Sequence, residues 1–150
     1  MSLENKVMTE MKAAMRAKDS NKLEALRAIK SGILLAKSEA GGKEGLTEDD
    51  QLKLLQKLVK QRRESAAIYT EQGRADLAQP EIDQALVIQQ FLPEQMSEEE
   101  IEKKVEEIIE KTGASGMQDM GKVMGMASKE LAGKADGRTI STIVKQKLSS

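Results

Sequence analysis

The sequence predicts an all-α fold, and three observations lead to that prediction. Apolar residues recur at intervals of three and four along most of the chain, which is the spacing of one buried helix face. Polar cap residues and glycines stand where these stripes begin and end. There are two prolines and almost no clusters of β-branched and aromatic residues, so strands are not expected. We predict about seven helices: a four-helix, bundle-like N-terminal domain over residues 1–93 and a small three-helix C-terminal domain over residues 97–150.

The first two helices are marked by a cap and a stripe each. Ser2 can cap the first helix, and the polar segment 18–20 ends it. The apolar stripe of this helix consists of Leu3, Val7, Met11 and Met15. Ser20 opens the second helix, and the glycine pair at 41–42 stops it. The stripe of the second helix consists of Leu23, Leu26, Ile29 and Ile33.

The third helix has a clear beginning, whereas the fourth contains a proline. Thr47 with Asp50 three residues later resembles a capping box, and Gly73 supplies a left-handed end. The stripe between them consists of Leu52, Leu55, Val59, Ala66 and Tyr69. Pro80 removes a helical hydrogen bond, so we expect either a kink near Gln79 or a new helix with Pro80 in its first turn. The following apolar positions, which run up to Pro93, are Ile82, Leu86, Gln89, Phe91 and Leu92.

Three shorter helices complete the chain. Ser97 with Glu100 forms a second capping box, and Gly113 ends a helix whose stripe is Ile101, Val105, Ile108 and Ile109. Ser115 begins the next helix and Gly133 stops it, with the stripe Met117, Met120, Val123, Met124 and Leu131. Methionines at this spacing usually belong to a core, and a Met-lined groove is the rarer alternative. Asp136 caps the last helix, which carries Ile140, Ile143, Val144 and Leu148.

Several classes of function are excluded or disfavoured by what the chain lacks. It contains no Cys and no His, so disulfides, the usual zinc ligands, a Cys nucleophile and imidazole acid–base chemistry are absent. Only Tyr69 and Phe91 are aromatic, which disfavours a base-stacking platform. No phosphate-binding glycine loop is present, and the glycines of segment 113–116 are read as turn residues. We predict no catalytic residue, metal or cofactor. The short apolar runs and the start of the chain favour a soluble cytoplasmic protein away from membranes.

The small net charge of -1 conceals a segregation of charge along the chain. Residues 1–40 carry +3, residues 41–110 carry -8 and residues 111–150 carry +4. Such asymmetry is a hint of an anionic partner, although a solvated helix face is the more ordinary explanation of surface lysines, and composition alone does not establish nucleic-acid binding. The candidate nucleic-acid contacts in the C-terminal part are Lys122, Lys129, Lys134, Arg138, Lys145 and Lys147.

A second basic cluster lies in the third helix and consists of Lys60, Arg62 and Arg63. Arg62 and Arg63 point about 100° apart, so they cannot both face one surface squarely. The alternative to nucleic-acid binding is pairing within the helix or with acidic neighbours, namely Glu71, Asp76 and Glu81.

The chain resembles the YqeY proteins in segments that follow one another in the right order over nearly its whole length. These segments are residues 1–19, 60–65 (KQRRES), 73–78, 91–95, 121–125, 133–138 and 143–148. In that family an N-terminal helical bundle precedes a small three-helix domain. The same module forms the tail of the GatB subunit of the tRNA-dependent amidotransferase and is appended to some glutaminyl-tRNA synthetases. The sequence departs from the family pattern at Pro80 and over 84–90, where acidic residues are more usual.

The resemblance implies association with tRNA, with an aminoacyl-tRNA synthetase or an amidotransferase component as a further candidate partner. A glutamine-dependent carbon–nitrogen ligase would need an activated nucleophile and a nucleotide site, and the chain offers neither a Cys nor a nucleotide loop. We therefore place a tRNA-binding accessory protein without catalysis first. A helical protein–protein adaptor is the second hypothesis, and a self-contained amidotransferase is the third.

Overall fold

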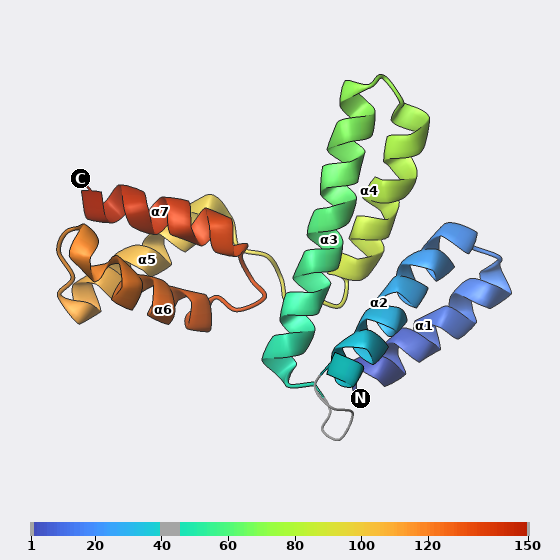
Figure 1. Cartoon of the computed structure of the whole chain (residues 1–150), viewed down its shortest axis with the longest axis horizontal. Coiled ribbons are helices and arrows are strands. Elements are labelled where there is room, and N and C mark those ends of the chain that lie inside the picture. The colour runs from blue at the N-terminus through green and yellow to red at the C-terminus, as the bar shows by residue number, and fades with distance from the viewer. Residues whose placement is uncertain (1, 40–45, 150) are drawn as a thin grey trace. The chain divides into compact units, whose positions relative to one another are not determined.

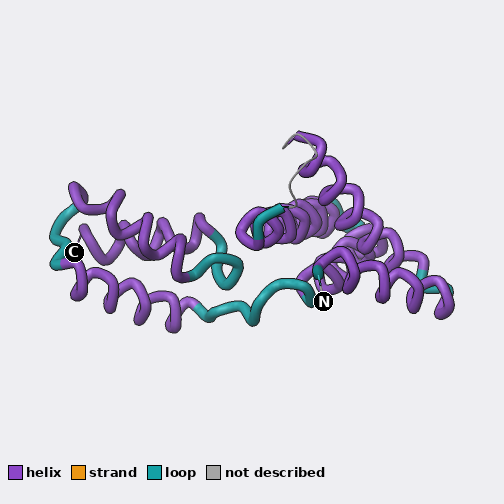
Figure 2. The backbone as a smooth tube through the Cα atoms, turned by 90° about the horizontal axis from the view of Figure 1, so that it is seen from below, coloured by secondary structure: helices purple, strands orange, loops and turns teal. Residues whose placement is uncertain are grey.

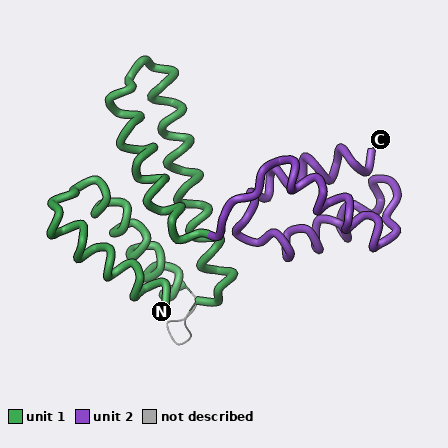
Figure 3. The backbone as a smooth tube through the Cα atoms, turned by 180° about the vertical axis from the view of Figure 1, so that it is seen from behind, with its two compact units in different colours: residues 1–92 green, residues 93–150 purple. Residues whose placement is uncertain are grey.

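The computed structural model describes residues 2–39 and 46–149, and within them it shows helices and turns but no strand (Figures 1 and 2). The all-α prediction is confirmed. The helices in these residues are α1 (Leu3–Ala17), α2 (Ser20–Glu39), α3 (Glu48–Glu71), α4 (Ala75–Gln89), α5 (Glu98–Thr112), the 3₁₀ turn η1 (Met117–Asp119), α6 (Met120–Glu130) and α7 (Gly137–Ser149). The glycines expected to stop the second helix, at 41–42, lie outside the described residues. The chain divides into two compact units, Met1–Leu92 and Pro93–Ser150 (Figure 3).

Unit 1 consists of two antiparallel hairpins, α1–α2 and α3–α4 (Figure 1). Helix α2 joins them because it packs against α1, α3 and α4. The most deeply buried large side chains of this unit include Leu26, Ile29, Leu55 and Ile88. A Cβ atom on Gly32 would lie 2.8 Å from a methyl group of Leu54, so the Leu54 side chain of α3 occupies the space beside Gly32 on α2.

The predicted caps of unit 1 are confirmed. The Ser2 side chain accepts a hydrogen bond from the Asn5 N–H, and Thr47 and Asp50 form both bonds of a capping box. Gly73 has a φ of 72°, the left-handed conformation expected at the end of the third helix.

Two of the predicted stripes are partly wrong, one on α1 and one on α4. Met15 is 50% exposed, and Ala14 is buried in its place. On α4, Leu86 is 56% exposed and Ile82 is exposed as well, whereas the buried positions are Ala78, Gln84, Ala85 and Ile88. The stripe on α1 consists only of steps of four, and each such step advances about 40° around an α-helix, so the stripe has left the buried face by Met15. On α4, Ile82 and Leu86 share one face, and the buried face is the neighbouring one that carries Gln84, Ala85 and Ile88.

Pro80 lies inside α4, which begins five residues earlier at Ala75 and runs through it. The alternative in which a new helix starts at Pro80 is therefore wrong. The carbonyl that loses its donor belongs to Asp76, which is an exposed residue in the first turn. The Pro80 carbonyl accepts a hydrogen bond of 3.1 Å from the Asn21 side-chain amide, which ties this part of α4 to α2.

Unit 2 packs α5, α6 and α7 around one apolar core that includes Val105, Val123 and Val144. The Ser97–Glu100 capping box and the left-handed Gly113 are present as predicted. Helix α6 begins at Met120 and not at Ser115. The Ser115 N–H donates to the Asp119 carboxylate over 2.8 Å, which closes a turn ahead of the helix.

The methionine stripe of the C-terminal part divides between core and surface. Met120 and Met124 are partly buried and pack against the core of unit 2, as the commoner interpretation predicted. Met117 lies in the 3₁₀ turn η1 and is exposed.

Candidate nucleic-acid interface

Two of the predicted cationic residues share one face of α6. Lys122 and Lys129 are seven residues apart in a continuous helix, so their side chains project from the same side. Both are exposed, and neither forms an ion pair with any residue between 2 and 39 or between 46 and 149. Their charges are therefore available to a partner.

Lys134 stands in the connection between α6 and α7, and the backbone of that connection is held in place. The Lys134 carbonyl accepts a hydrogen bond of 3.0 Å from the Met96 N–H. The neighbouring Gly133 carbonyl accepts one of 2.7 Å from the Gln95 side chain. These two bonds fix the position from which the exposed Lys134 side chain projects, so a phosphate contact there would start from a constrained backbone.

The three cations of α7 differ in their surroundings. Arg138 and Lys145 are exposed and seven residues apart on one face of the helix, and Lys145 forms no ion pair within the described segments. Arg138 borders a polar pocket of about 370 Å³ that is also lined by the carboxylates Glu98 and Glu102. Those carboxylates would weaken its attraction for a phosphate.

Lys147 is already paired. Its ammonium group lies 2.7 Å from the Glu106 carboxylate of α5, and the hydrogen bond to that carboxylate raises the pKa of Lys147 above its ordinary value. Of the six predicted residues, the four lysines with the most available charge are Lys122, Lys129, Lys134 and Lys145.

The second basic cluster has a largely structural arrangement. The half-buried Arg62 donates from Nε to the Gln84 side-chain oxygen at 3.2 Å, and from Nη1 to the Leu58 carbonyl at 3.3 Å. Arg63 donates to the Gln89 side chain. The two arginines therefore bond to the side-chain amides of Gln84 and Gln89 on α4 and not to the carboxylates that were expected. The third member of the cluster, Lys60, is exposed.

One of the expected carboxylates, Asp76, is instead paired with Arg74, at 3.0 Å. The hydrogen bonds from the Arg74 guanidinium hold the pKa of Asp76 below its ordinary value.

Sequence reasoning missed the centre of this arrangement, Gln84. It is the one polar side chain that is buried among the described residues, and it links three helices. Its oxygen accepts from Arg62 of α3, and its nitrogen donates to Asn21 of α2 at 2.9 Å. The available signal was its place four residues before Ile88, on the face that α4 buries.

Other kinds of site find no support in the described part of the chain. No group of three or more acidic side chains there could hold a metal ion. None of the helices described is long and apolar enough to span a bilayer.

Fold and surface together define a class of small all-helical proteins with two units. In this protein the second unit carries exposed lysines, among them Lys122, Lys129 and Lys145, that form no ion pair in the described part of the chain. The profile of the family described as Yqey-like protein matches residues 4–148, and the chain therefore belongs to the YqeY family. One of the subunits of the glutamyl-tRNA(Gln) amidotransferase of Thermococcus gammatolerans is 40% identical to this chain over 57 residues. That match covers 35% of the chain and 9% of the relative, so the chain spans a small part of that protein.

Proposed function

We propose that this protein is a tRNA-associated accessory module that binds tRNA through phosphate contacts from its second unit and performs no catalysis of its own. The observation that carries the proposal is the set of exposed lysines on α6, the α6–α7 connection and α7, among which Lys122, Lys129 and Lys145 form no ion pair in the described ranges. The chain is also similar to a protein named as part of a glutamyl-tRNA(Gln) amidotransferase, which supports tRNA as the negatively charged partner of these lysines.

Contacts of this type recognise the position of phosphates more than the identity of bases. The only two aromatic residues, Tyr69 and Phe91, both lie in unit 1, so stacking on bases contributes little in this mechanism. Binding to tRNA is then governed by shape and weakens steeply as salt rises, because each contact releases condensed counterions.

The non-catalytic part of the proposal rests on residue chemistry and on the extent of the match. Amide transfer from glutamine requires an activated nucleophile; the sequence contains no Cys and no His, so a serine activated by another base such as lysine would have to supply it. The aligned region corresponds to 9% of the relative, so most of that protein has no counterpart in the match. We expect the purified protein to release no ammonia from glutamine and to hydrolyse no ATP. Ammonia release that a single Ser→Ala substitution abolishes would contradict this expectation.

The binding proposal is tested by the salt dependence of tRNA affinity. Fluorescence anisotropy with labelled total tRNA gives log Kd against log salt for the wild type and for Lys122→Ala/Lys129→Ala. Each lost phosphate contact makes the slope shallower by a little under one unit, so the double variant should lose up to about two units. The matched control is Lys6→Ala/Lys57→Ala, which removes the same charge from two exposed positions of unit 1 whose side chains form no ion pair among residues 2–39 and 46–149.

The alternative site in unit 1 is best tested with Lys60→Ala, because Arg62 also holds Gln84 and its loss would perturb the fold. An unchanged slope for the α6 variant together with a shallower one for Lys60→Ala would move the site to unit 1. No binding of tRNA by the wild type at low salt would reject the tRNA proposal.

A further inference from the structure

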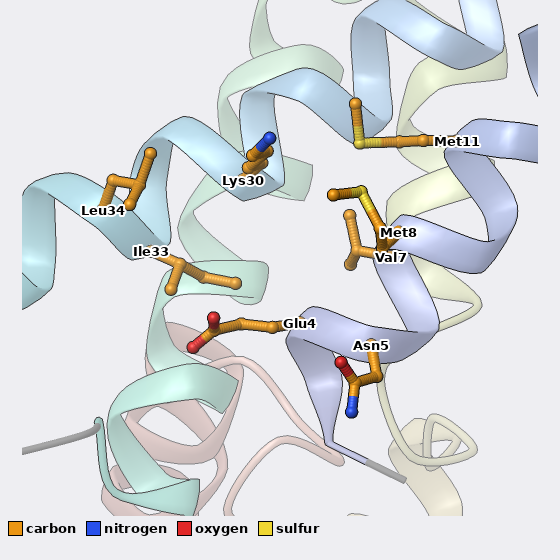
Figure 4. Close-up of a pocket in the computed structure, with 8 residues that line it drawn as sticks. All are labelled: Glu4, Asn5, Val7, Met8, Met11, Lys30, Ile33 and Leu34. Carbon is orange, nitrogen blue, oxygen red and sulfur yellow. The ribbon is translucent and has the colours of Figure 1, made fainter.

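An apolar groove runs between α1 and α2, within unit 1. It encloses about 160 Å³, and its apolar lining includes Met8 and Met11 from α1 with Ile33 and Leu34 from α2. Figure 4 shows Met8, Met11 and Glu4 reaching from α1 toward α2. The groove is distinct from the lysine surface of unit 2, because every residue that lines it belongs to unit 1.

The rim of this groove leaves large apolar side chains in contact with solvent. Met8 is 42% exposed and Leu34 is 58% exposed, and the exposed Met15 continues the line along α1. Met8, Met11 and Met15 are spaced by three and four residues, so they form a strip about 10 Å long. Met11, in the middle of this line, is buried, so the exposed apolar side chains along the groove are Met8, Met15 and Leu34. A group of exposed apolar side chains beside a groove is a feature of interaction sites in soluble proteins.

The charge around the groove is unbalanced and positive. Glu4, the carboxylate of the lining, already forms an ion pair of 2.5 Å with Lys37. Lys30, the cation of the lining, has no carboxylate partner among residues 2–39 and 46–149. Lys12 and Arg27 are exposed and also unpaired within those ranges, and they lie one turn from Met8 and Lys30, respectively.

We propose that the α1–α2 groove binds an amphipathic helix of a protein partner that carries carboxylates beside its apolar stripe. A helix with apolar residues at i, i+3, i+4 and i+7 presents a strip about as long as the line from Met8 to Met15, because both span seven residues of helix. Methionine side chains adapt to the shape of such a strip, and the unpaired Lys30 selects a carboxylate at its edge. This binding goes beyond the proposed function, because it uses another unit and another class of partner.

The concave, apolar lining favours this occupant over RNA. A phosphate backbone would satisfy Lys30 but would leave the methionines without apolar contacts, and the groove has no aromatic side chain on which a base could stack. The acidic amphipathic helix satisfies both the apolar strip and the cation.

The test uses the full chain and two capped 18-residue peptides labelled with a fluorophore. Both peptides carry leucines at i, i+3, i+4 and i+7 over two repeats. One has glutamates at the flanking positions, and the other has lysines at the same positions. Anisotropy at 100 mM salt should show the acidic peptide binding at least tenfold more tightly than the basic one. Met8→Asp and Leu34→Asp should abolish binding of the acidic peptide, and because both side chains are exposed, the variants should keep the wild-type helicity and Tm.

Charge reversal at one position distinguishes the groove from other surfaces. Lys30→Glu should weaken the acidic peptide by about fivefold or more and strengthen the basic one, since an exposed pair contributes up to ~1 kcal/mol. The matched control, Lys57→Glu on the exposed face of α3, should leave both affinities within twofold. Lys122→Ala/Lys129→Ala should also leave peptide binding unchanged, so failure of the groove proposal and failure of the tRNA proposal are separate results.

Three outcomes would overturn the proposal. The first is no saturable binding of the acidic peptide by the wild type at millimolar concentration. The second is equal loss of acidic-peptide affinity in Lys30→Glu and Lys57→Glu. The third is that the wild type binds phosphatidylcholine–phosphatidylglycerol vesicles and Met8→Asp does not, while the peptides bind the wild type and Met8→Asp equally well. That result would assign the methionine strip to a lipid surface.

Discussion

Replacing Gln84 by leucine should destabilise unit 1, although leucine is close to glutamine in volume and more apolar. The substitution removes the acceptor of the Arg62 Nε–H, at 3.2 Å, and the donor to the Asn21 side chain, at 2.9 Å. It also leaves the half-buried guanidinium with the Leu58 carbonyl as its remaining acceptor among the bonds described for it. The buried polar link between α2, α3 and α4 would then be broken at its centre.

The magnitude follows from the kind of bonds that are lost. A hydrogen bond to a charged group contributes about 1.5–3 kcal/mol, and a neutral one contributes about 0.5–1.5 kcal/mol. Greater apolar burial by leucine offsets about 1 kcal/mol of this loss. The net cost is about 2 kcal/mol, which corresponds to a fall of roughly 8–16 °C in the Tm of a unit of this size.

The assay is urea unfolding followed by tyrosine fluorescence, because the single tyrosine, Tyr69, lies in α3 and the chain has no tryptophan. The matched control is Gln79→Leu on the same helix, where the side chain is exposed and, among residues 2–39 and 46–149, bonds only to the exposed Asp83. Its effect should stay within about 0.5 kcal/mol. In a double-mutant cycle with Arg62→Leu, the double variant should lose at least about 1 kcal/mol less than the sum of the single variants. Additive effects, or a Gln84→Leu protein as stable as the control variant, would refute this account of Gln84.

Two further predictions concern Asp76 and the connection between the units. The hydrogen bonds from Arg74 lower the pKa of Asp76, so the carboxylate contributes stability above its unfolded pKa and loses that contribution as pH falls through the folded pKa. In an NMR titration, the Arg74→Ala variant should show the pKa of Asp76 raised toward its ordinary value. An unchanged pKa would assign the shift to another cause. We also propose that the two units fold as separate domains. Limited proteolysis should then cut within residues 93–97 before it cuts α3 or α5. Early cleavage inside either helix would argue against independent domains.

Local sequence signals identified most helix ends because the interactions that form them are local. The Thr47–Asp50 and Ser97–Glu100 capping boxes join residues three apart, and Gly113 meets a backbone requirement of a single position. The stripes of α5 and α7 were also predicted, since their apolar residues combine steps of three and four and stay on one face. Where the spacing consisted only of steps of four, as at Met15, the prediction left the buried face.

The candidate site was likewise predicted in part from the sequence and decided in part by the tertiary structure. Charge counting along the sequence located the basic C-terminal part, and the helical period placed Lys122 and Lys129 on one face. It could not show that Lys147 is paired with Glu106, because those residues are 41 positions apart and meet only when α7 packs on α5. Gln84 likewise depends on partners 22 and 63 positions away.

The sequence by itself therefore determined the all-α class, most of the helix ends and the segregation of charge, all of which depend on periodicity and on neighbours within one turn. Tertiary structure alone decided which cations remain unpaired, how α4 accommodates Pro80 and which apolar side chains stay exposed beside α1 and α2. Those outcomes depend on how helices distant in the chain approach one another, as where the Leu54 side chain of α3 lies against Gly32 of α2. Interhelical packing sums many weak contacts between residues far apart in sequence, and no single stretch of the chain encodes that sum.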